Sequence, residues 1–257
     1  SEPRMTKPVR VLMVLTVLFA KNGITNCVMN YVSCFNPARV RCDLVCPNEP
    51  GEAARELVRR TGGDVFVLGG RNRNPFSYLR ALSRIVRERG EEIVHAHGNS
   101  ATLYTEMLAA KMGGAAIAMP HSHNTTCKMK AADRLLRGLF YQSYTQAIAC
   151  SRAAGEWLYP GRPFTVLNNA IDAERFRFDP DARAALRRQL GILPEEFVYI
   201  HVGAFNEQKH QAFLLEAFKR VVNNRGSIKL LLVGDGERRY ACETFAQTLG
   251  IGARVYF

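Results

Sequence analysis

Short apolar runs alternate with amphipathic segments almost without interruption through the first 170 residues of the chain. The apolar runs have the length of strands, and the segments between them carry apolar positions at helical spacing. Strands are predicted over 9–15, 41–46, 64–68, 93–97, 115–119, 146–149 and 164–167. Helices are predicted over 25–34, 51–61, 75–89, 100–112, 131–144 and 151–158. Continuously apolar strands joined by helices are typical of a buried parallel sheet covered on both faces. Residues 5–170 are therefore predicted to form a doubly wound, Rossmann-like α/β domain.

The pattern changes after this domain and then resumes. Residues 171–194 are predicted to form a polar linker with one short helix over 181–190. In the remaining segment, 195–257, the predicted strands are 197–202, 228–233 and 255–257, and the predicted helices are 209–223 and 237–249. Sheets usually contain roughly four to six strands. The pattern therefore predicts an incomplete second Rossmann-like domain over 195–257.

Composition narrows the class of protein only slightly. The 257 residues carry a formal net charge of +12, which favours anionic partners such as phosphorylated molecules or an anionic membrane face. The basic residues are dispersed, so a solvated basic surface explains them equally well. The seven cysteines include no Cys-x-x-Cys pair, which indicates a reducing cytoplasm without a disulfide framework. The apolar run 11–20 imitates a secretory signal, but it lacks a good cleavage site and is too short to cross a bilayer.

Polar residues gather where the predicted strands end, which is where open parallel sheets bind ligands. His95 and His97 lie in one strand, and His121 and His123 follow the next. Alternation places each pair on one face of its strand. Several histidines beside Ser, Asn and Thr indicate a polar site for a sugar or a phosphate. A metal site is the competing interpretation, and it is less favoured because no Asp or Glu lies among them.

Other strand ends carry further candidates, each of which has a purely structural alternative. Asn22-Gly23 opens a helix, where backbone N–H groups can approach an anion, or it is a plain turn. The remaining candidates in the first domain are Asn99, Ser122, Asn124 and Asn169. Their side chains could bind a ligand or shape their own loops.

The second domain repeats the arrangement with glycines. Gly203 and Gly234 each follow a predicted strand, and Lys209 lies in the first turn of the predicted helix 209–223. A cation is disfavoured there by the helix dipole unless an anion is bound. These three residues are therefore candidates for binding a diphosphate. The sequence has no Walker motif, no Gly-x-Ser-x-Gly elbow and no groove-reading module, so an NTPase and a hydrolase are disfavoured and nucleic acid is not expected as a partner.

Taken together, these motifs resemble the large GT-B family of retaining glycosyltransferases, family 4, in its bacterial exopolysaccharide branch. The matching stretches are 22–25, 94–100, 121–125, 149–151, 169–172, 205–209 and 233–236. They occur in the family's order and cover nearly the whole chain.

The resemblance implies transfer of a sugar from a nucleotide-diphosphate sugar with retention of anomeric configuration. It implies no cofactor and no obligatory metal. The backbone at Gly23 would meet the donor phosphates, His123 would lie near the transferred sugar, and Lys209 would hold the diphosphate. Asn22, His97, Asn99, Ser122, Asn124 and Asn169 would line the substrate site. The acceptor would be a saccharide or a lipid-linked molecule, which suits a cytoplasmic protein with peripheral contact at an anionic inner membrane face.

Two departures from the family pattern stand out. Ala204 follows Gly203 where the family usually has an arginine, so diphosphate binding would rest on Lys209 and backbone dipoles. Family chains also continue well beyond the position of Phe257, so the isolated chain is expected to have little or no transferase activity. Two alternatives remain: a GT-B sugar-nucleotide epimerase, or a non-catalytic module that binds a sugar or a partner.

Overall fold

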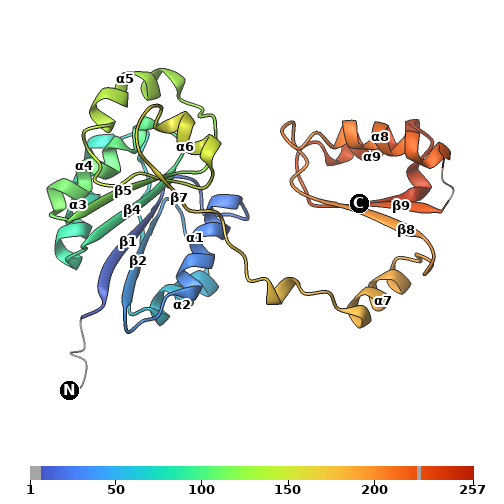
Figure 1. The fold of residues 1–257 in the computed structure, drawn as a ribbon, viewed down its shortest axis with the longest axis horizontal. Helices are drawn as coiled ribbons and strands as arrows, with labels where there is room; N and C mark the ends of the chain where they lie inside the picture. Colours follow the sequence, from blue (N-terminus) through green and yellow to red (C-terminus); the bar gives the residue numbers. More distant parts are fainter. Residues whose placement is uncertain (1–6, 225–226) are drawn as a thin grey trace. The chain divides into compact units, whose positions relative to one another are not determined.

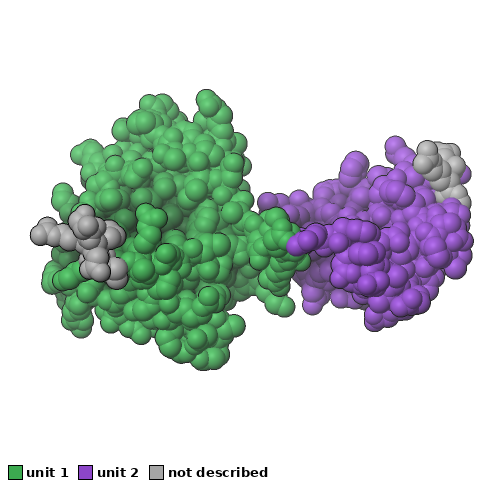
Figure 2. Space-filling model, turned by 60° about the horizontal axis from the view of Figure 1, so that its bottom comes forward, with its two compact units in different colours: residues 1–175 green, residues 176–257 purple. Residues whose placement is uncertain are grey.

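The computed structural model describes residues 7–224 and 227–257, so residues 5 and 6 of the predicted first domain lie outside it. By the density of contacts the chain divides after Arg175 into two compact units, which Figure 2 colours separately. Unit 1 contains residues 1–175 and unit 2 contains residues 176–257. The helix of the predicted linker, α7 (Pro180–Gln189), belongs to unit 2.

Unit 1 is built on one parallel sheet with the strand order β3-β2-β1-β4-β5-β6-β7 (Figure 1). Its strands are β1 (Val9–Leu15), β2 (Val40–Cys46), β3 (Val65–Val67), β4 (Ile93–Gly98), β5 (Ile117–Ser122), β6 (Ile148–Ala149) and β7 (Thr165–Val166). Its α-helices are α1 (Gly23–Cys34), α2 (Glu52–Arg60), α3 (Pro75–Arg89), α4 (Tyr104–Gly113), α5 (Lys130–Phe140) and α6 (Arg152–Leu158). The predicted doubly wound α/β fold is confirmed for this unit.

The helices cover both faces of this sheet because its strands are apolar on both sides. On one face Val28 of α1 and Val58 of α2 pack against Met13 and Leu44. The other face carries α3, α4 and α5, whose buried side chains join Leu12 in a separate core cluster. Figure 1 shows the two layers of helices on opposite sides of the sheet.

The strand order reverses direction between β1 and β4, and this point determines where the site lies. The chain builds β1, β2 and β3 outward, then crosses over through α3 and continues with β4 on the other side of β1. Leu15 at the end of β1 is in register with His97 of β4. In doubly wound sheets, such a switch point leaves a crevice at the carboxyl ends of the strands.

Unit 2 repeats the first half of this topology on a smaller scale. Its strands β8 (Phe197–Val202), β9 (Ile228–Val233) and β10 (Val255–Tyr256) form a parallel sheet in the order β10-β9-β8. The helices α8 (Gln211–Asn224) and α9 (Arg239–Thr248) follow β8 and β9, as Figure 1 shows. Phe205, Leu215 and Leu232 lie in its buried core.

Several element ends differ from the prediction. The strand β5 runs on to Ser122, because the polar residues His121 and Ser122 still pair with β6. The helix α5 ends at Phe140, four residues before the predicted end at 144, where a turn begins. The helix α8 begins at Gln211, because His210 has a left-handed φ of 50° that interrupts the helical path.

No helix in the described part of the chain combines the length and apolar composition needed to cross a bilayer.

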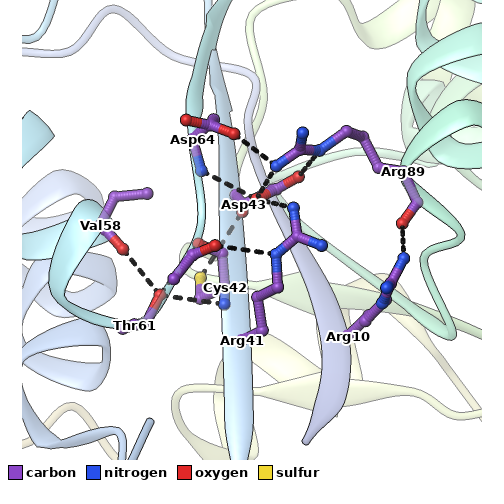
Figure 3. Close-up of polar contacts among 9 residues, drawn as sticks. Arg10, Arg41, Cys42, Asp43, Val58, Thr61, Asp64 and Arg89 are labelled. Atoms are coloured by element: carbon purple, nitrogen blue, oxygen red, sulfur yellow. Dashed lines mark hydrogen bonds and ion pairs between the residues drawn. The ribbon is translucent and has the colours of Figure 1, made fainter.

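A charge network lies on β2 around the buried carboxylate of Asp43 (Figure 3). Arg89 donates from Nε to Asp43 Oδ2 over 2.6 Å and forms a second ion pair with Asp64. The backbone N–H of Asp64 donates to Asp43 Oδ1 over 2.8 Å. Burial raises the pKa of Asp43, but the hydrogen bonds from its neighbours outweigh burial and leave its pKa lowered. These contacts tie β2, β3 and the end of α3 together.

Candidate functional site

Four imidazole rings lie together at the carboxyl ends of β4 and β5. Nε2 of His95 is 3.1 Å from Nδ1 of His121, and Nδ1 of His97 is 2.9 Å from Nε2 of His123. The ring centroids of His95 and His97 are 4.2 Å apart, and those of His121 and His123 are 4.1 Å apart. Residues spaced by two on neighbouring parallel strands project to one face, which is why the two pairs meet.

Burial keeps these rings neutral. The pKa is lowered to about 3 for His95, to about 2 for His121 and to about 4 for His123, and it lies well below the ordinary value for His97. Burial is the largest cause for each ring, and for His95, His97 and His121 neighbouring imidazoles add to it, because a second positive charge would be repelled. Neutral rings can donate and accept hydrogen bonds, and they also offer lone pairs.

The loop after β1 begins at this cluster. Thr16 donates from both its backbone N–H and its hydroxyl to the carbonyl of His97. Asn22 then caps α1 by accepting a hydrogen bond from the N–H of Thr25 over 2.9 Å. Gly23 is the first residue of α1 and is exposed. A Cβ at this position would meet nothing within 4 Å, so packing inside the protein does not require a glycine there.

The other predicted residues of unit 1 have different surroundings. Asn99 has a buried Oδ1 with no hydrogen-bond partner among the residues that the structure describes. Ser122 is buried and donates to the carbonyl of Ala154 over 2.9 Å, so its hydroxyl is used within the fold. Asn124 accepts from the N–H of Thr125. Asn169 is exposed and accepts a hydrogen bond from Cys27 Sγ, which fastens the segment after β7 to α1.

A neighbouring pocket was missed by the sequence prediction. It has a volume of about 440 Å³ and lies at the ends of β1, β2 and β3; it is lined by Thr16, Leu18, Pro47, Gly70, Arg71, Asn72 and Arg73. Arg71 forms a two-pronged ion pair with the fully buried Glu106, with N–O distances of 2.6 and 2.7 Å. The sequence does contain a feature that could have predicted this pocket, because the basic loop 69–73 directly follows a predicted strand.

In unit 2 the loops after β8 and β9 lie side by side. Gly234 has a φ of 152°, and a Cβ there would come within 2.1 Å of the carbonyl oxygen of Gly203. The aliphatic part of the Lys209 side chain lies over Gly203. Lys209 lies in a turn two residues before α8, so the prediction that it lies in the first turn of the helix is wrong. The helix dipole therefore gives no reason to expect an anion beside Lys209. Within 7–224 and 227–257 its exposed ammonium makes no ion pair.

Comparison with protein families identifies both parts of the chain. The model of Glycosyltransferase Family 4 matches residues 21–175, and the model of Glycosyl transferases group 1 matches residues 182–257. The putative glycosyltransferase EpsF of Bacillus subtilis (strain 168) is 30% identical over 240 residues. That match covers 88% of this chain and 62% of EpsF, so the chain spans less than two thirds of this relative.

Solved structures agree on the fold. The crystal structure of Anabaena Alr3699/HepE in complex with UDP and glucose matches with a TM-score of 0.75 at 19% identity, over 96% of this chain and 68% of that one. The crystal structure of a glycosyltransferase from Rickettsia africae ESF-5 matches with a TM-score of 0.76 at 13% identity, over 97% and 68%. The predicted GT-B architecture is confirmed by these neighbours.

The family-4 model alone covers more than half of the chain, in the unit that carries the histidine cluster and the switch point. The chain therefore belongs to glycosyltransferase family 4.

Proposed function

We propose that the protein transfers a sugar, with retention of configuration, from a nucleotide-diphosphate sugar to a saccharide or lipid-linked acceptor. The observation that carries this proposal is the convergence of His97, His123 and the β1–α1 loop on the switch point of unit 1, in a chain whose two parts both match glycosyltransferase models. We place the role in exopolysaccharide or cell-envelope synthesis at the cytoplasmic side of a membrane.

The chemistry asked of the protein is mainly electrostatic. Departure of the nucleotide diphosphate builds negative charge, which fixed N–H groups and cations can stabilise in place. In unit 2, Lys209 has a free ammonium among the described residues, and its aliphatic part lies over the backbone of Gly203. Lys209 and this backbone would take the role of the arginine that the family usually has at the position of Ala204. In unit 1, the open space at Gly23 would allow a phosphate to reach the first N–H groups of α1.

His123 is the residue that we assign to the transferred sugar. Its ring is half-buried and neutral, and Nε2 is held by His97. A neutral imidazole held in this way can bond a sugar hydroxyl without adding charge to the site. Asn99, whose Oδ1 lacks a partner in the described structure, is a second contact for the substrate.

Product analysis with radiolabelled UDP- and GDP-sugars tests the proposal. The protein is expressed from its whole coding sequence and supplied with membrane lipid extract as a source of acceptors. Label that moves into a saccharide or lipid product supports transfer. A labelled sugar nucleotide whose sugar is epimerised supports the epimerase alternative, and absence of binding to every donor in calorimetry supports a non-catalytic module.

The substitution Gly23→Ala tests the donor loop. We expect it to lower kcat/KM by about tenfold to a hundredfold, because a methyl group would displace the phosphate from the N-terminus of α1. The free energy of unfolding should stay the same or rise by up to ~1 kcal/mol, since alanine is the better helix residue. Steady-state kinetics and urea unfolding measure the two effects.

Gly138→Ala is the matched control, because Gly138 lies in α5 and a Cβ there also meets nothing within 4 Å. It should leave kcat/KM unchanged. Equal kinetics for Gly23→Ala and the parent protein would remove Gly23 from the donor site.

A further inference from the structure

The histidine cluster has a property that sugar binding does not explain: it contains a buried ring nitrogen without a partner on a histidine that is not assigned to the sugar. Nε2 of His121 is buried and has no hydrogen-bond partner in the described part of the chain. A neutral imidazole has one N–H and one lone pair. Whichever tautomer His121 adopts, its Nε2 stays unsatisfied, at a cost of roughly 1–3 kcal/mol.

The composition of the cluster is that of a ligand set for a transition metal. His95, His97 and His121 each offer one ring nitrogen, and these three atoms lie within 4.8 Å of one another. All three residues are buried, and the set consists of imidazoles alone. Imidazole suits zinc, copper, nickel and iron, whereas magnesium, calcium and manganese prefer carboxylate and carbonyl oxygen.

The three donor nitrogens lie within 4.8 Å of one another, so an ion that binds all three must draw them closer together. Zinc binds imidazole nitrogen at about 2.0–2.1 Å, so two nitrogens on one tetrahedral ion lie roughly 3.4 Å apart. Nε2 of His95 and Nδ1 of His121 share a hydrogen bond of 3.1 Å, so Nε2 is the nitrogen of His121 that is left for a ligand. The register of β4 and β5, in which His97 is opposite His121, holds the donors on one face of the sheet.

We propose that His95, His97 and His121 bind one divalent transition-metal ion, with zinc as the natural occupant. The three imidazoles leave a fourth position for an exogenous ligand such as water. The ion joins β4 to β5 and stabilises unit 1. The metal set shares His97 with the substrate site proposed above, but the experiment below measures metal binding and not sugar transfer.

Cobalt(II) is the probe, because a four-coordinate cobalt ion absorbs visible light while zinc is silent. The protein is prepared without a polyhistidine tag and titrated with cobalt(II), then with zinc. We expect one cobalt per chain with micromolar or tighter affinity, a d–d spectrum of four-coordinate nitrogen and oxygen ligation, and displacement by zinc. Zinc should also raise the Tm of unit 1 relative to chelator-treated protein, followed by the fluorescence of Trp157, the only tryptophan.

Variants assign the ligands. His95→Gln and His121→Gln should each weaken cobalt binding by more than the roughly 10- to 100-fold that loss of an outer-shell partner costs. His210→Gln in unit 2 is the matched control and should bind as the parent does. If a cluster variant fails to fold, the titration and the Tm shift of the parent protein decide alone.

Three results would overturn the proposal. The first is that the protein binds no stoichiometric cobalt in the micromolar range. The second is an intense thiolate-to-cobalt band, which would assign the ion to cysteines, and the third is unchanged cobalt affinity in folded His95→Gln and His121→Gln.

Discussion

Replacement of Arg71 by methionine is expected to destabilise unit 1 by about 3–5 kcal/mol, because it leaves the carboxylate of Glu106 buried and unpaired. The Glu106 side chain is fully buried, and Arg71 supplies both of its ion-pair contacts. Arg71 also donates to the carbonyl of Thr102 over 2.8 Å, so the loop after β3 loses its attachment to the start of α4. Urea unfolding followed by Trp157 fluorescence measures the loss in unit 1.

Arg73→Met is the matched control for this prediction. Arg73 lines the same pocket, but it is exposed, and its substitution should change stability by no more than about 0.5 kcal/mol. The double variant Arg71→Met, Glu106→Leu removes both charges and should recover most of the loss, since the penalty comes from the unpaired carboxylate. If Arg71→Met alone were as stable as the parent, Glu106 would have to take up a proton or reach water at little cost in free energy.

The second large effect is expected in the dependence of stability on pH, through Glu91. Burial, the hydrogen bond with Asp43 and the charge of Asp43 together raise the pKa of Glu91 to about 8, against the opposing effect of Arg41 and Arg89. Oε2 of Glu91 is buried without a partner among the described residues, which a protonated carboxyl would resolve by donating to Asp43. The folded protein therefore holds a proton that the unfolded chain releases above its ordinary pKa of 4.5.

The sign follows from proton binding. Between pH 4.5 and about 8 the folded state binds more protons than the unfolded state, so the free energy of unfolding falls as the pH rises. Glu91→Gln replaces the protonated acid by a neutral amide and removes this fall. The difference in free energy of unfolding between the variant and the parent should therefore grow with pH. It should be roughly 2–4 kcal/mol larger, in favour of the variant, at about pH 8.5 than near pH 4.5.

Urea unfolding at several pH values, again followed by Trp157, gives the two profiles. Glu88→Gln, on the exposed side of α3, is the control and should run parallel to the parent. Parallel profiles for Glu91→Gln and the parent would show that Glu91 is ionised in the folded protein.

The fold could be predicted from the sequence because its signals are local. Apolar runs of strand length and helical spacing lie within short windows, and they located β1 and α3 to the residue. Ends set by single turns were less accurate, as at α8, where the backbone of His210 decides the start. The rule that ligand-binding residues follow parallel strands also selects His97 and His123 as candidates from the sequence alone.

Tertiary structure decided which partners those residues have. The sequence cannot say that His97 meets His123, since this depends on β4 and β5 being neighbours in register. It could not show that Ser122 is turned toward α6, nor that Arg71 reaches Glu106 across 35 positions. Periodicity is a property of neighbouring residues, whereas strand order, side-chain partners and burial arise only when distant segments pack together. The sequence by itself thus determined the class of fold and the edge of the sheet where the candidate site residues lie, and packing determined which polar groups there remain unpartnered among the described residues.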